Sequence, residues 1–327
     1  MAGSNKYKLL LPDTMAPAGW EVLKEHPDFE AVKFSWTLTP PQFQALLGDV
    51  HGVALGGTPF REPELSAAPV IKAVARLGVG YDAVDVTALS KRSVPLFVTG
   101  IANSPSVAEL ALFFMLSLAK RGAAYDGDVR EGRWANRLNR NPLDLLGKTV
   151  LIVGFGRIGS RTAARCRAME MQVLVYDPFV AAATVRQAGC EKVDDLDAAL
   201  PRADFLTVHC PKTKDTTGLI GASRLKRMKP SAFLVNTARG GIVDEAALHA
   251  ALTTGKLAGA GLDVFDPEPP LADNPLFKLD NVIFAPHMAG VTWEASNRMA
   301  AISVRNLIDC ILGKPHRENA INPEVLG

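Results

Sequence analysis

The stretch VLIVGFGRIG, residues 150–159, decides the fold of this chain. Four apolar residues, typical of a buried strand, run directly into a turn with three glycines, and the helical pattern of residues 160–169 follows. Gly154 permits a tight turn, Gly156 lets a pyrophosphate approach bare backbone, and Gly159 allows the helix to pack closely. Because the helix N-terminus then faces the phosphates, the stretch predicts a dinucleotide-binding site.

An acidic residue follows where a dinucleotide ribose would need one. A second apolar strand ends in Asp177, about 18 residues after Gly159 and near the usual spacing of about 20. A carboxylate there accepts hydrogen bonds from the ribose hydroxyls and repels a 2′-phosphate, and Pro178 and Phe179 offer no cation to bind one. We therefore expect NAD rather than NADP. A structural glycine turn and a solvated Asp177 are the alternative, which the order of strand, turn, helix, strand and acid disfavours.

The remaining chain repeats this alternation of apolar runs and helical patterns, which is typical of strands joined by crossover helices in a parallel sheet. The predicted strands lie at residues 7–11, 31–34, 52–55, 71–76, 96–98, 149–153, 172–177, 205–209, 233–237, 259–264 and 282–285. The predicted helices lie at residues 18–26, 41–47, 84–92, 104–121 and 294–312. The fold class is therefore α/β. The helix at 104–121 is apolar on all sides, so we expect it to be buried at a domain junction or a subunit interface.

Composition excludes several classes of protein. A chain of 327 residues should form two compact units. Its 36 basic and 34 acidic residues give a net charge of +2, too small to favour nucleic acid or anionic lipid as a partner. No apolar run suits a signal peptide or a membrane span. The four cysteines lack the close pairing of a zinc site, so we expect reduced thiols, no metal and a cytoplasmic location.

Three further strand ends carry polar residues, and parallel sheets place ligands at this carboxyl edge. Arg239 emerges from NTARGGIVD and can clamp a planar carboxylate. Glu268 lies in GLDVFDPEPP, where prolines stiffen the chain, and His287 lies in APHMAG, where it can carry a proton near neutral pH. Taken singly, a helix-capping arginine, an incidental glutamate and a structural histidine are the alternatives.

Together these residues meet one chemical requirement. Reduction of a 2-keto acid needs a hydride donor, a cation for the substrate carboxylate and a proton donor at the carbonyl oxygen. Arg239 can be the cation and His287 the proton donor. A contact from Glu268 would orient the imidazole and favour its protonated form.

On these motifs the chain resembles the D-2-hydroxyacid dehydrogenases, the family that includes phosphoglycerate, glyoxylate and hydroxypyruvate, and formate dehydrogenases. The resemblance covers nearly the whole length. The matching stretches are GFGRIG with Asp177, VHCPKTKDTTGLI from Val208, NTARGGIVDE from Asn236, GLDVFDPEPP from Gly261 and APHMAG from Ala285.

The resemblance implies an architecture and a set of site residues. It implies a Rossmann doubly wound cofactor domain at 102–291, inserted in a flavodoxin-like substrate domain at 1–101 and 292–327. It also implies a homodimer joined through the cofactor domain, which would explain the apolar helix, with Trp134 reaching the partner. The implied catalytic residues are Arg239, Glu268 and His287. The implied cofactor-binding residues are Val79, Gly154, Gly156, Arg157, Ile158, Gly159, Asp177, His209, Cys210, Pro211, Thr216, Thr237, Ala238, Arg239, Asp263, His287 and Gly290, with Asp263 on the nicotinamide carboxamide. The implied substrate-binding residues are Leu55, Gly56, Gly78, Val79, Gly80, Asn103 and Arg239.

The first substrate loop departs from the pattern of members that act on phosphorylated substrates. Those members often carry an arginine there, whereas residues 54–58 are uncharged. We also expect no appended regulatory domain after Gly327. A small unphosphorylated 2-keto acid such as glyoxylate or hydroxypyruvate is therefore favoured. The alternatives are 3-phosphoglycerate, with Arg61 or Arg76 serving its phosphate, and an NAD(H)-sensing binding protein similar to the corepressors that share this scaffold.

Overall fold

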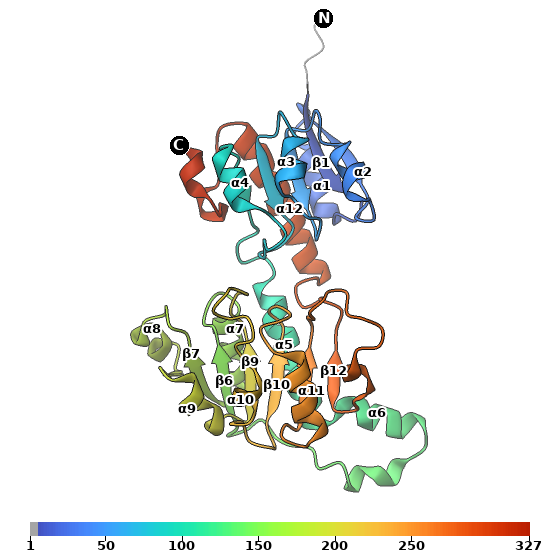
Figure 1. Ribbon diagram of the computed structural model, residues 1–327, viewed down its shortest axis with the longest axis vertical. Helices are drawn as coiled ribbons and strands as arrows, with labels where there is room; N and C mark the ends of the chain where they lie inside the picture. Colours follow the sequence, from blue (N-terminus) through green and yellow to red (C-terminus); the bar gives the residue numbers. More distant parts are fainter. Residues whose placement is uncertain (1–5) are drawn as a thin grey trace, which may run out of the picture. The chain divides into compact units, whose positions relative to one another are not determined.

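The computed structural model describes residues 6–327, which divide into two compact units, each built around its own parallel sheet (Figure 1). Unit 1 combines the chain up to Asn103 with Gly290–Gly327, and unit 2 is Ser104–Ala289. The prediction of an α/β fold is confirmed. Within the described residues no helix is both long enough and apolar enough to cross a bilayer.

Unit 1 contains a five-stranded sheet in the order β2-β1-β3-β4-β5, the strand order of flavodoxin-like folds. Its strands are β1 (Tyr7–Pro12), β2 (Phe29–Phe34), β3 (Gly52–Leu55), β4 (Ala73–Arg76) and β5 (Leu96–Phe97). Its helices are α1 (Pro17–Lys24), α2 (Pro40–Gln44), α3 (Glu62–Ser66), α4 (Val86–Lys91) and α12 (Trp293–Ile311). The final helix thus returns to the first hundred residues, and it packs against α1 and β4.

Alternate residues of these strands face two different cores, because successive side chains of a strand point to opposite faces. Leu10 and Val53 pack with residues of α2, α3 and α4. Leu9 and Ala54 pack with residues of α1 and α12. Helices therefore cover both faces of the sheet, which explains why its central strand β3 is apolar and buried along its whole length.

Unit 2 contains a seven-stranded sheet in the order β12-β11-β10-β9-β6-β7-β8. Its strands are β6 (Thr149–Val153), β7 (Gln172–Tyr176), β8 (Glu191–Lys192), β9 (Phe205–Val208), β10 (Phe233–Asn236), β11 (Gly259–Leu262) and β12 (Val282–Phe284). The chain runs outward from β6 over β7 and β8, and then returns to β9 on the other side of β6. This reversal is the Rossmann switch point, where the crevice for a dinucleotide opens beyond the carboxyl ends of the strands.

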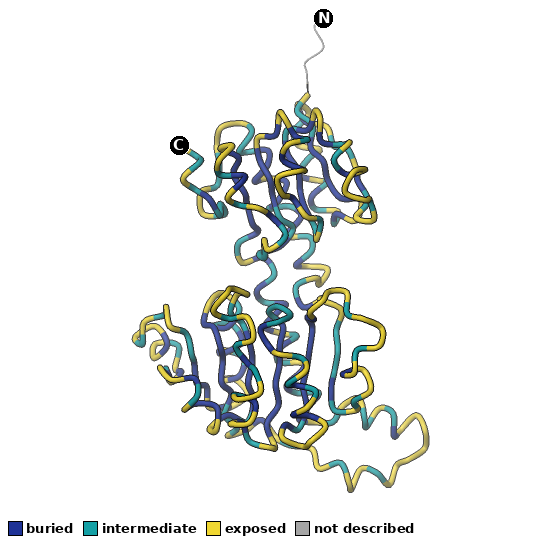
Figure 2. The backbone as a smooth tube through the Cα atoms, in the orientation of Figure 1, coloured by how far each residue is buried: buried dark blue, intermediate teal, exposed yellow. Residues whose placement is uncertain are grey.

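Two layers of helices cover the sheet of unit 2. Its helices are α5 (Ser104–Lys120), α6 (Gly122–Arg130), α7 (Gly159–Ala168), α8 (Ala182–Gln187), α9 (Leu196–Ala199), α10 (Ala222–Leu225) and α11 (Glu245–Thr253). Leu151 and Leu206 face α9, α10 and α11, while Ile152 and Phe205 face α5, α7 and α8. The central strands β9, β10 and β11 are buried along their whole length between these layers, and Figure 2 draws them in dark blue.

The structure departs from the sequence-based prediction at several elements. Strand β8 was not predicted, because its two residues, Glu191 and Lys192, are charged. The short helix α3 was not predicted either. Helix α5 forms as expected, and Phe113 on it is 53% exposed, so burial of this helix at a subunit interface stays a prediction. That exposed side leaves an apolar surface without a partner in the described chain.

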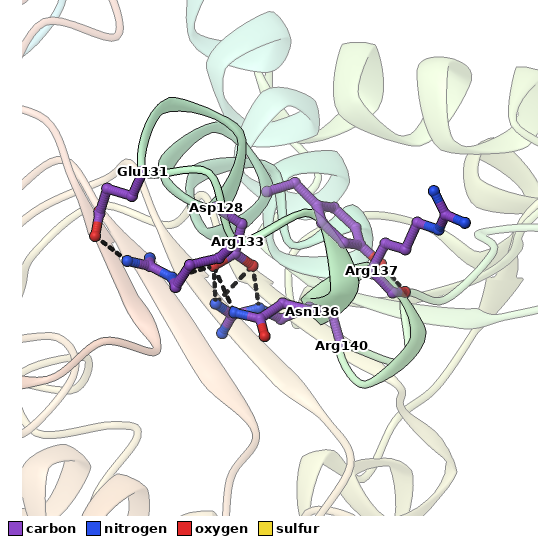
Figure 3. A network of polar contacts seen from close by, with 7 residues as sticks. Asp128, Glu131, Arg133, Asn136, Arg137 and Arg140 are labelled. Carbon is purple, nitrogen blue, oxygen red and sulfur yellow. Dashed lines mark hydrogen bonds and ion pairs between the residues drawn. The ribbon is translucent and has the colours of Figure 1, made fainter.

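Residues 122–140 form the arm of unit 2 that carries Trp134, and its two helices, α6 and the short η1 (Trp134–Leu138), were not predicted. Figure 3 shows that Arg133, Asn136 and Arg140 converge on buried Asp128. The Asp128 carboxylate accepts hydrogen bonds from Arg133 Nε and Asn136 Nδ2 at 2.9 Å each, and from Arg140 Nε at 2.8 Å. Hydrogen bonds from Asn136, Arg140 and Arg133 lower the pKa of Asp128 to about 2, against the opposing effect of burial. One carboxylate therefore ties the arm together.

Candidate active site

The glycine turn after β6 has the geometry that a dinucleotide site requires. A Cβ on Gly154 would lie 2.7 Å from the Cys210 nitrogen, and a Cβ on Gly159 would lie 2.0 Å from the Gly154 oxygen. Gly154 also has a φ of +97°, which side chains disfavour. A Cβ on Gly156, by contrast, would meet nothing within 4 Å. Packing thus requires Gly154 and Gly159, whereas the open space at Gly156 suits the approach of a ligand.

The two residues between these glycines face outward at the start of α7. Arg157 is exposed, and Ile158 is half-buried and precedes the first turn of the helix. The Ile158 carbonyl accepts the Thr162 hydroxyl at 3.1 Å. A ten-residue helix therefore starts at the glycine turn, so the positive end of the helix dipole lies there.

Asp177 is held at the edge of the same turn. Its Oδ2 accepts the Phe155 NH at 2.7 Å, and its Oδ1 accepts the Phe179 NH at 2.9 Å. The carboxylate therefore joins the end of β7 to the glycine turn after β6. In Rossmann folds the acid at the end of the second strand is the residue that binds the ribose of the dinucleotide.

Lys192 of β8 is a cation beside Asp177 that sequence reasoning missed. Its Nζ donates to the Asp177 carbonyl at 2.7 Å and lies 3.6 Å from an Asp194 oxygen. The sequence-based prediction considered only Pro178 and Phe179, the next two residues of the chain. It could not detect a lysine that comes from a neighbouring strand. A two-residue strand pairing, Leu174 with Glu191 and Val175 with Lys192, brings it there.

The end of β9 supplies the opposite wall of the glycine turn. His209 Nε2 lies 2.9 Å from the Thr207 hydroxyl oxygen, and burial lowers the pKa of His209 to about 3, so the ring is neutral. Burial raises the pKa of Cys210 to about 11, so its thiol stays protonated. Thr216 turns back onto this segment and donates to the Pro211 carbonyl at 2.6 Å. The four predicted residues therefore form one short wall.

Two buried polar atoms near these strand ends have no hydrogen-bond partner within residues 6–327: Nδ1 of His209 and Oγ1 of Thr237. Buried polar groups without partners are rare and call for an explanation. Both belong to the residues predicted to contact the cofactor. Together with the open space at Gly156, they show that this edge of unit 2 fits a bound dinucleotide.

Glu268 and His287 meet at the ends of β11 and β12. The His287 Nδ1 atom lies 2.8 Å from Glu268 Oε2, and Glu268 Oε1 accepts the Phe265 NH at 3.2 Å. Burial raises the pKa of Glu268, but the hydrogen bond and charge of His287, the Phe265 NH and the Arg239 charge outweigh it, so the pKa is lowered. The carboxylate is therefore ionised at neutral pH, and the imidazole is fixed through one nitrogen with Nε2 left for another partner.

Arg239 lies at the end of β10, one strand from this pair. Its Nη1 donates to the Ala238 carbonyl at 2.7 Å, and its side chain is half-buried. Since its charge contributes to the lowered pKa of Glu268, the guanidinium and the carboxylate lie within electrostatic reach. The structure thus brings the three predicted catalytic side chains to one edge of unit 2.

Asp263 holds the turn that carries His287. Its buried carboxylate accepts the Met288 NH at 2.8 Å through Oδ1 and the Ala289 NH at 3.0 Å through Oδ2, and its carbonyl accepts the His287 NH at 2.8 Å. His287 has a φ of +55°, a left-handed conformation that is uncommon for a side-chain-bearing residue. Burial raises the pKa of Asp263, and the hydrogen bonds from the Ala289 and Met288 NH groups oppose that shift. The sequence showed only that Asp263 is an acid at a strand end. Its hydrogen bonds to the turn that carries His287 are seen only in the structure.

The residues predicted to bind the substrate carboxylate lie at the carboxyl edge of the sheet in unit 1. Leu55 is the last residue of β3 and its side chain is buried in the core, so its backbone faces the loop. Arg76, the last residue of β4, donates through Nε to the Gly80 carbonyl at 2.9 Å and through Nη1 to the Leu55 carbonyl at 3.2 Å. A Cβ on Gly56 or Gly78 would meet nothing within 4 Å. Val79 is half-buried between Gly78 and Gly80.

Two further predicted residues flank the boundary of unit 1. A Cβ on Gly290 would lie 2.7 Å from Asn103 Nδ2, so the two residues are in close contact. The Oδ1 atom of Asn103 is buried without a hydrogen-bond partner among the described residues.

The four cysteines are unpaired, and two of them, Cys166 and Cys190, are buried.

Comparison with known proteins agrees with this geometry. Residues 112–289 match the family model of the D-isomer specific 2-hydroxyacid dehydrogenase, NAD binding domain. The chain is 43% identical over 258 residues to D-3-phosphoglycerate dehydrogenase of Archaeoglobus fulgidus, covering 79% of this chain and 48% of the relative. It is 36% identical to glyoxylate reductase of Korarchaeum cryptofilum, covering 94% of this chain and 93% of the relative. The chain therefore spans about half the length of the phosphoglycerate dehydrogenase and nearly all of the glyoxylate reductase.

Solved structures show the same fold. The crystal structure of an NADPH-dependent glyoxylate/hydroxypyruvate reductase from Sinorhizobium meliloti, in complex with NADP and malonate, has a TM-score of 0.79 and 30% identity. The match covers 93% of each chain. The prediction of a nicotinamide cofactor is confirmed by the family match over most of unit 2. Taken with the glycine turn and the strand-end residues, these matches show that the chain belongs to the D-isomer specific 2-hydroxyacid dehydrogenase family.

Proposed function

We propose that this chain is an NAD-dependent reductase of small, unphosphorylated 2-keto acids, with glyoxylate and hydroxypyruvate favoured, and that it also oxidises the corresponding D-2-hydroxy acids. The Glu268–His287 pair carries this proposal, because an oriented imidazole at a cofactor edge suits proton transfer. One relative, which the match covers over 93% of its own length, is a glyoxylate reductase.

Each residue of the trio has a separate task. Arg239 binds the substrate carboxylate, since a guanidinium matches a planar carboxylate with two hydrogen bonds. His287, held through Nδ1, gives a proton from Nε2 to the carbonyl oxygen as the keto acid is reduced. Glu268 holds the ring in place and stabilises its positive charge. When bound, the nicotinamide supplies or accepts the hydride.

The rest of the cofactor site binds and orients. The NH groups at the start of α7 hold the pyrophosphate beside Gly156, and Asp177 accepts hydrogen bonds from the ribose hydroxyls. His209, Cys210, Pro211 and Thr216 line the adenosine side, while Thr237, Ala238 and Asp263 lie at the nicotinamide end. The family resemblance also implies Val79 and Gly290 as cofactor-binding residues.

The substrate loops of unit 1 favour an unphosphorylated acid. Residues 54–58 carry no charge, so they offer no cation to a phosphate. The Arg76 guanidinium donates to two backbone carbonyls, which ties it to the loops. We infer that the backbone NH groups around Gly56 and Gly78–Gly80 donate hydrogen bonds to the substrate carboxylate. Asn103, at the boundary of unit 1, is the further substrate-binding residue.

A phosphorylated substrate is the second candidate. It is supported by the 43% identity with a phosphoglycerate dehydrogenase, whose own length is about twice that of the match. Arg61 is exposed and remains a phosphate ligand to test in that case.

We further propose a homodimer joined through unit 2. Phe113 on α5 is 53% exposed, and Trp134 and Leu138 on the arm are 62% and 77% exposed. Apolar side chains of this size, exposed along one helix and a folded arm, are typical of an interface between subunits. Sedimentation of the wild-type chain should show a dimer, and Leu138→Asp should shift it toward monomer. A monomeric wild-type chain contradicts the dimer.

The function is tested by mixing the purified chain with NADH and a panel of 2-keto acids, and following the loss of NADH absorbance. Glyoxylate and hydroxypyruvate should give the highest kcat/KM, and 3-phosphohydroxypyruvate a lower one. The highest kcat/KM with the phosphorylated acid would reverse the choice of substrate. Tight NADH binding without turnover of any acid would favour an NAD(H)-sensing binding protein.

A further inference from the structure

Asn236 closes the loop that presents Arg239. It is the last residue of β10 and only 2% exposed. Its Oδ1 accepts the Ala238 NH at 3.0 Å, and its Nδ2 donates to the Arg239 carbonyl at 2.9 Å. One buried side chain therefore fixes the backbone on both sides of the peptide that joins Ala238 to Arg239.

The far side of Arg239 is fixed as well. A Cβ on Gly240 would lie 1.7 Å from the Phe265 oxygen, so the backbones of the two loops are in direct contact there. The Asn236 carbonyl also accepts the Asp263 NH at 3.0 Å, which ties the end of β10 to the strand that leads to Glu268. The backbone of Arg239 is thus held between the Asn236 amide and the Phe265 segment.

We propose that Asn236 is a positioning residue that sets the direction from which Arg239 meets the substrate carboxylate. The proposal rests on the function proposed above, in which Arg239 binds that carboxylate. A long side chain reaches one target reliably only if its backbone is fixed, because a change in φ and ψ is amplified along the side chain. Both ends of a primary amide are needed here: one accepts and the other donates.

A purely structural asparagine would give a different result. Loss of a buried amide lowers the stability of the fold wherever the amide lies. Loss of a positioning residue also lowers kcat/KM for the keto acid, because Arg239 then meets the substrate carboxylate less well. Asn322 provides the matched control in unit 1. It is also 2% exposed, its Oδ1 accepts the Leu96 NH at 2.8 Å, and its Nδ2 donates to the Val94 carbonyl at 3.0 Å.

The test compares Asn236→Asp with Asn322→Asp in the full-length chain. Asn236→Asp keeps the shape and the acceptor for the Ala238 NH, but it sets a carboxylate oxygen against the Arg239 carbonyl. For this variant kcat/KM for the keto acid should fall roughly 10- to 100-fold, mainly through KM, with the Kd of NADH unchanged. Asn322→Asp should lower the Tm and leave kcat/KM within about twofold of the wild type. In an Arg239→Lys background, Asn236→Asp should add little further loss, since coupled residues are not additive.

Three outcomes would overturn the proposal: an unchanged kcat/KM in Asn236→Asp, full additivity with Arg239→Lys, or an equal loss in Asn322→Asp. If Asn236→Asp does not fold, Asn236→Ser is measured in its place. Its hydroxyl can still accept a local NH but is too short to reach both partners, so the same loss is expected. A wild-type chain that reduces no keto acid overturns the proposed function itself, whereas an active wild type with an unaffected Asn236→Asp overturns this inference alone.

Discussion

The Nδ1 atom of His287 lies 2.8 Å from Oε2 of Glu268, although the two residues come from loops that follow different strands. The hydrogen bond leaves Nε2 as the nitrogen free to face a substrate. It also couples the ring to a carboxylate whose pKa is lowered, so the negative charge persists at neutral pH. The pair is therefore arranged to hold a proton at one defined atom, which the following predictions examine.

Replacement of His287 by alanine should remove the proton donor and spare the cofactor site. We expect kcat for keto-acid reduction to fall by a factor of roughly 10² to 10⁴. The Kd of NADH, measured by fluorescence titration, should stay near the wild-type value. Wild-type turnover in His287→Ala would remove this residue from the mechanism. His249 on α11 is a control, because it belongs to another part of unit 2 and His249→Ala should leave kcat unchanged.

Glu268→Gln should keep the size of the side chain and remove its charge. Because the protonated ring then loses a negative neighbour, the pH–rate profile for reduction should move to lower pH, and kcat at neutral pH should fall roughly 10- to 100-fold. On the acid side of the profile, the pKa of Glu268 is lowered, so its carboxylate stays ionised and paired with His287 as pH falls to the ordinary carboxyl value of about 4.3. A pH profile identical to that of the wild type would contradict the role of Glu268.

Asp177→Ala should relax the discrimination between the two nicotinamide cofactors. Removal of the carboxylate lifts the repulsion of a 2′-phosphate and leaves Lys192 Nζ, which donates to the residue 177 carbonyl, as a nearby cation. The ratio of kcat/KM for NADH to that for NADPH should therefore fall by about tenfold or more. Asp194→Ala is the matched control, because it removes an exposed acid that lies 3.6 Å from the same lysine. An equal effect of the control, or an unchanged ratio in Asp177→Ala, would argue against ribose recognition by Asp177.

Asp263→Asn should release the turn that carries His287. One carboxylate oxygen becomes an NH2 group that faces a backbone NH, so a buried donor loses its acceptor, at a cost of about 1–3 kcal/mol in the free energy of unfolding. Urea unfolding measures this cost, and kcat should fall as well because His287 has a left-handed φ of +55°. In Asp204→Asn, which also removes an acceptor of a backbone NH in unit 2, stability should fall while kcat is retained. Retained kcat in Asp263→Asn would show that the turn holds without its carboxylate.

Asp128→Asn should loosen the arm at residues 122–140. The pKa of Asp128 is about 2, below the value of about 3.9 in an unfolded chain. Its stabilising effect is therefore complete above about pH 4 and is lost as pH falls toward 2. At neutral pH trypsin should cleave the arm faster in Asp128→Asn than in the wild type, and pepsin should cleave the wild-type arm faster as pH falls through this range. Asp126→Asn removes one exposed ion pair with Arg130 on the same helix and should change little.

The cofactor half of the site could be predicted from the sequence because its signals are local. Gly154, Gly156 and Gly159 lie within six positions of one strand-to-helix turn, and the conformation of such a turn depends on the residues in it. The apolar runs likewise indicated a covered parallel sheet, and the family resemblance was confirmed by the comparisons.

Other features escaped prediction because their causes lie far apart in the chain. Lys192 lies in a two-residue charged strand that carries no apolar pattern, yet pairing with β7 brings it to Asp177. The helices in the arm around Asp128 were not predicted, because polar contacts to one buried carboxylate hold the arm together rather than an apolar pattern in the sequence. Arg76, which by type suited a phosphate, donates to the carbonyls of Leu55 and Gly80.

The sequence by itself determined the fold class, the nicotinamide cofactor and the family of this protein, because short-range patterns encode a strand, a turn and the helix that follows. Only the tertiary structure decided how the strand-end residues are held: the distance between Glu268 and His287, the clamp of Asp263 on the His287 turn and the closure of the Arg239 loop by Asn236. These relations join residues that follow different strands or turn back on themselves. Their geometry depends on strand order and register, which the packing of the whole sheet fixes.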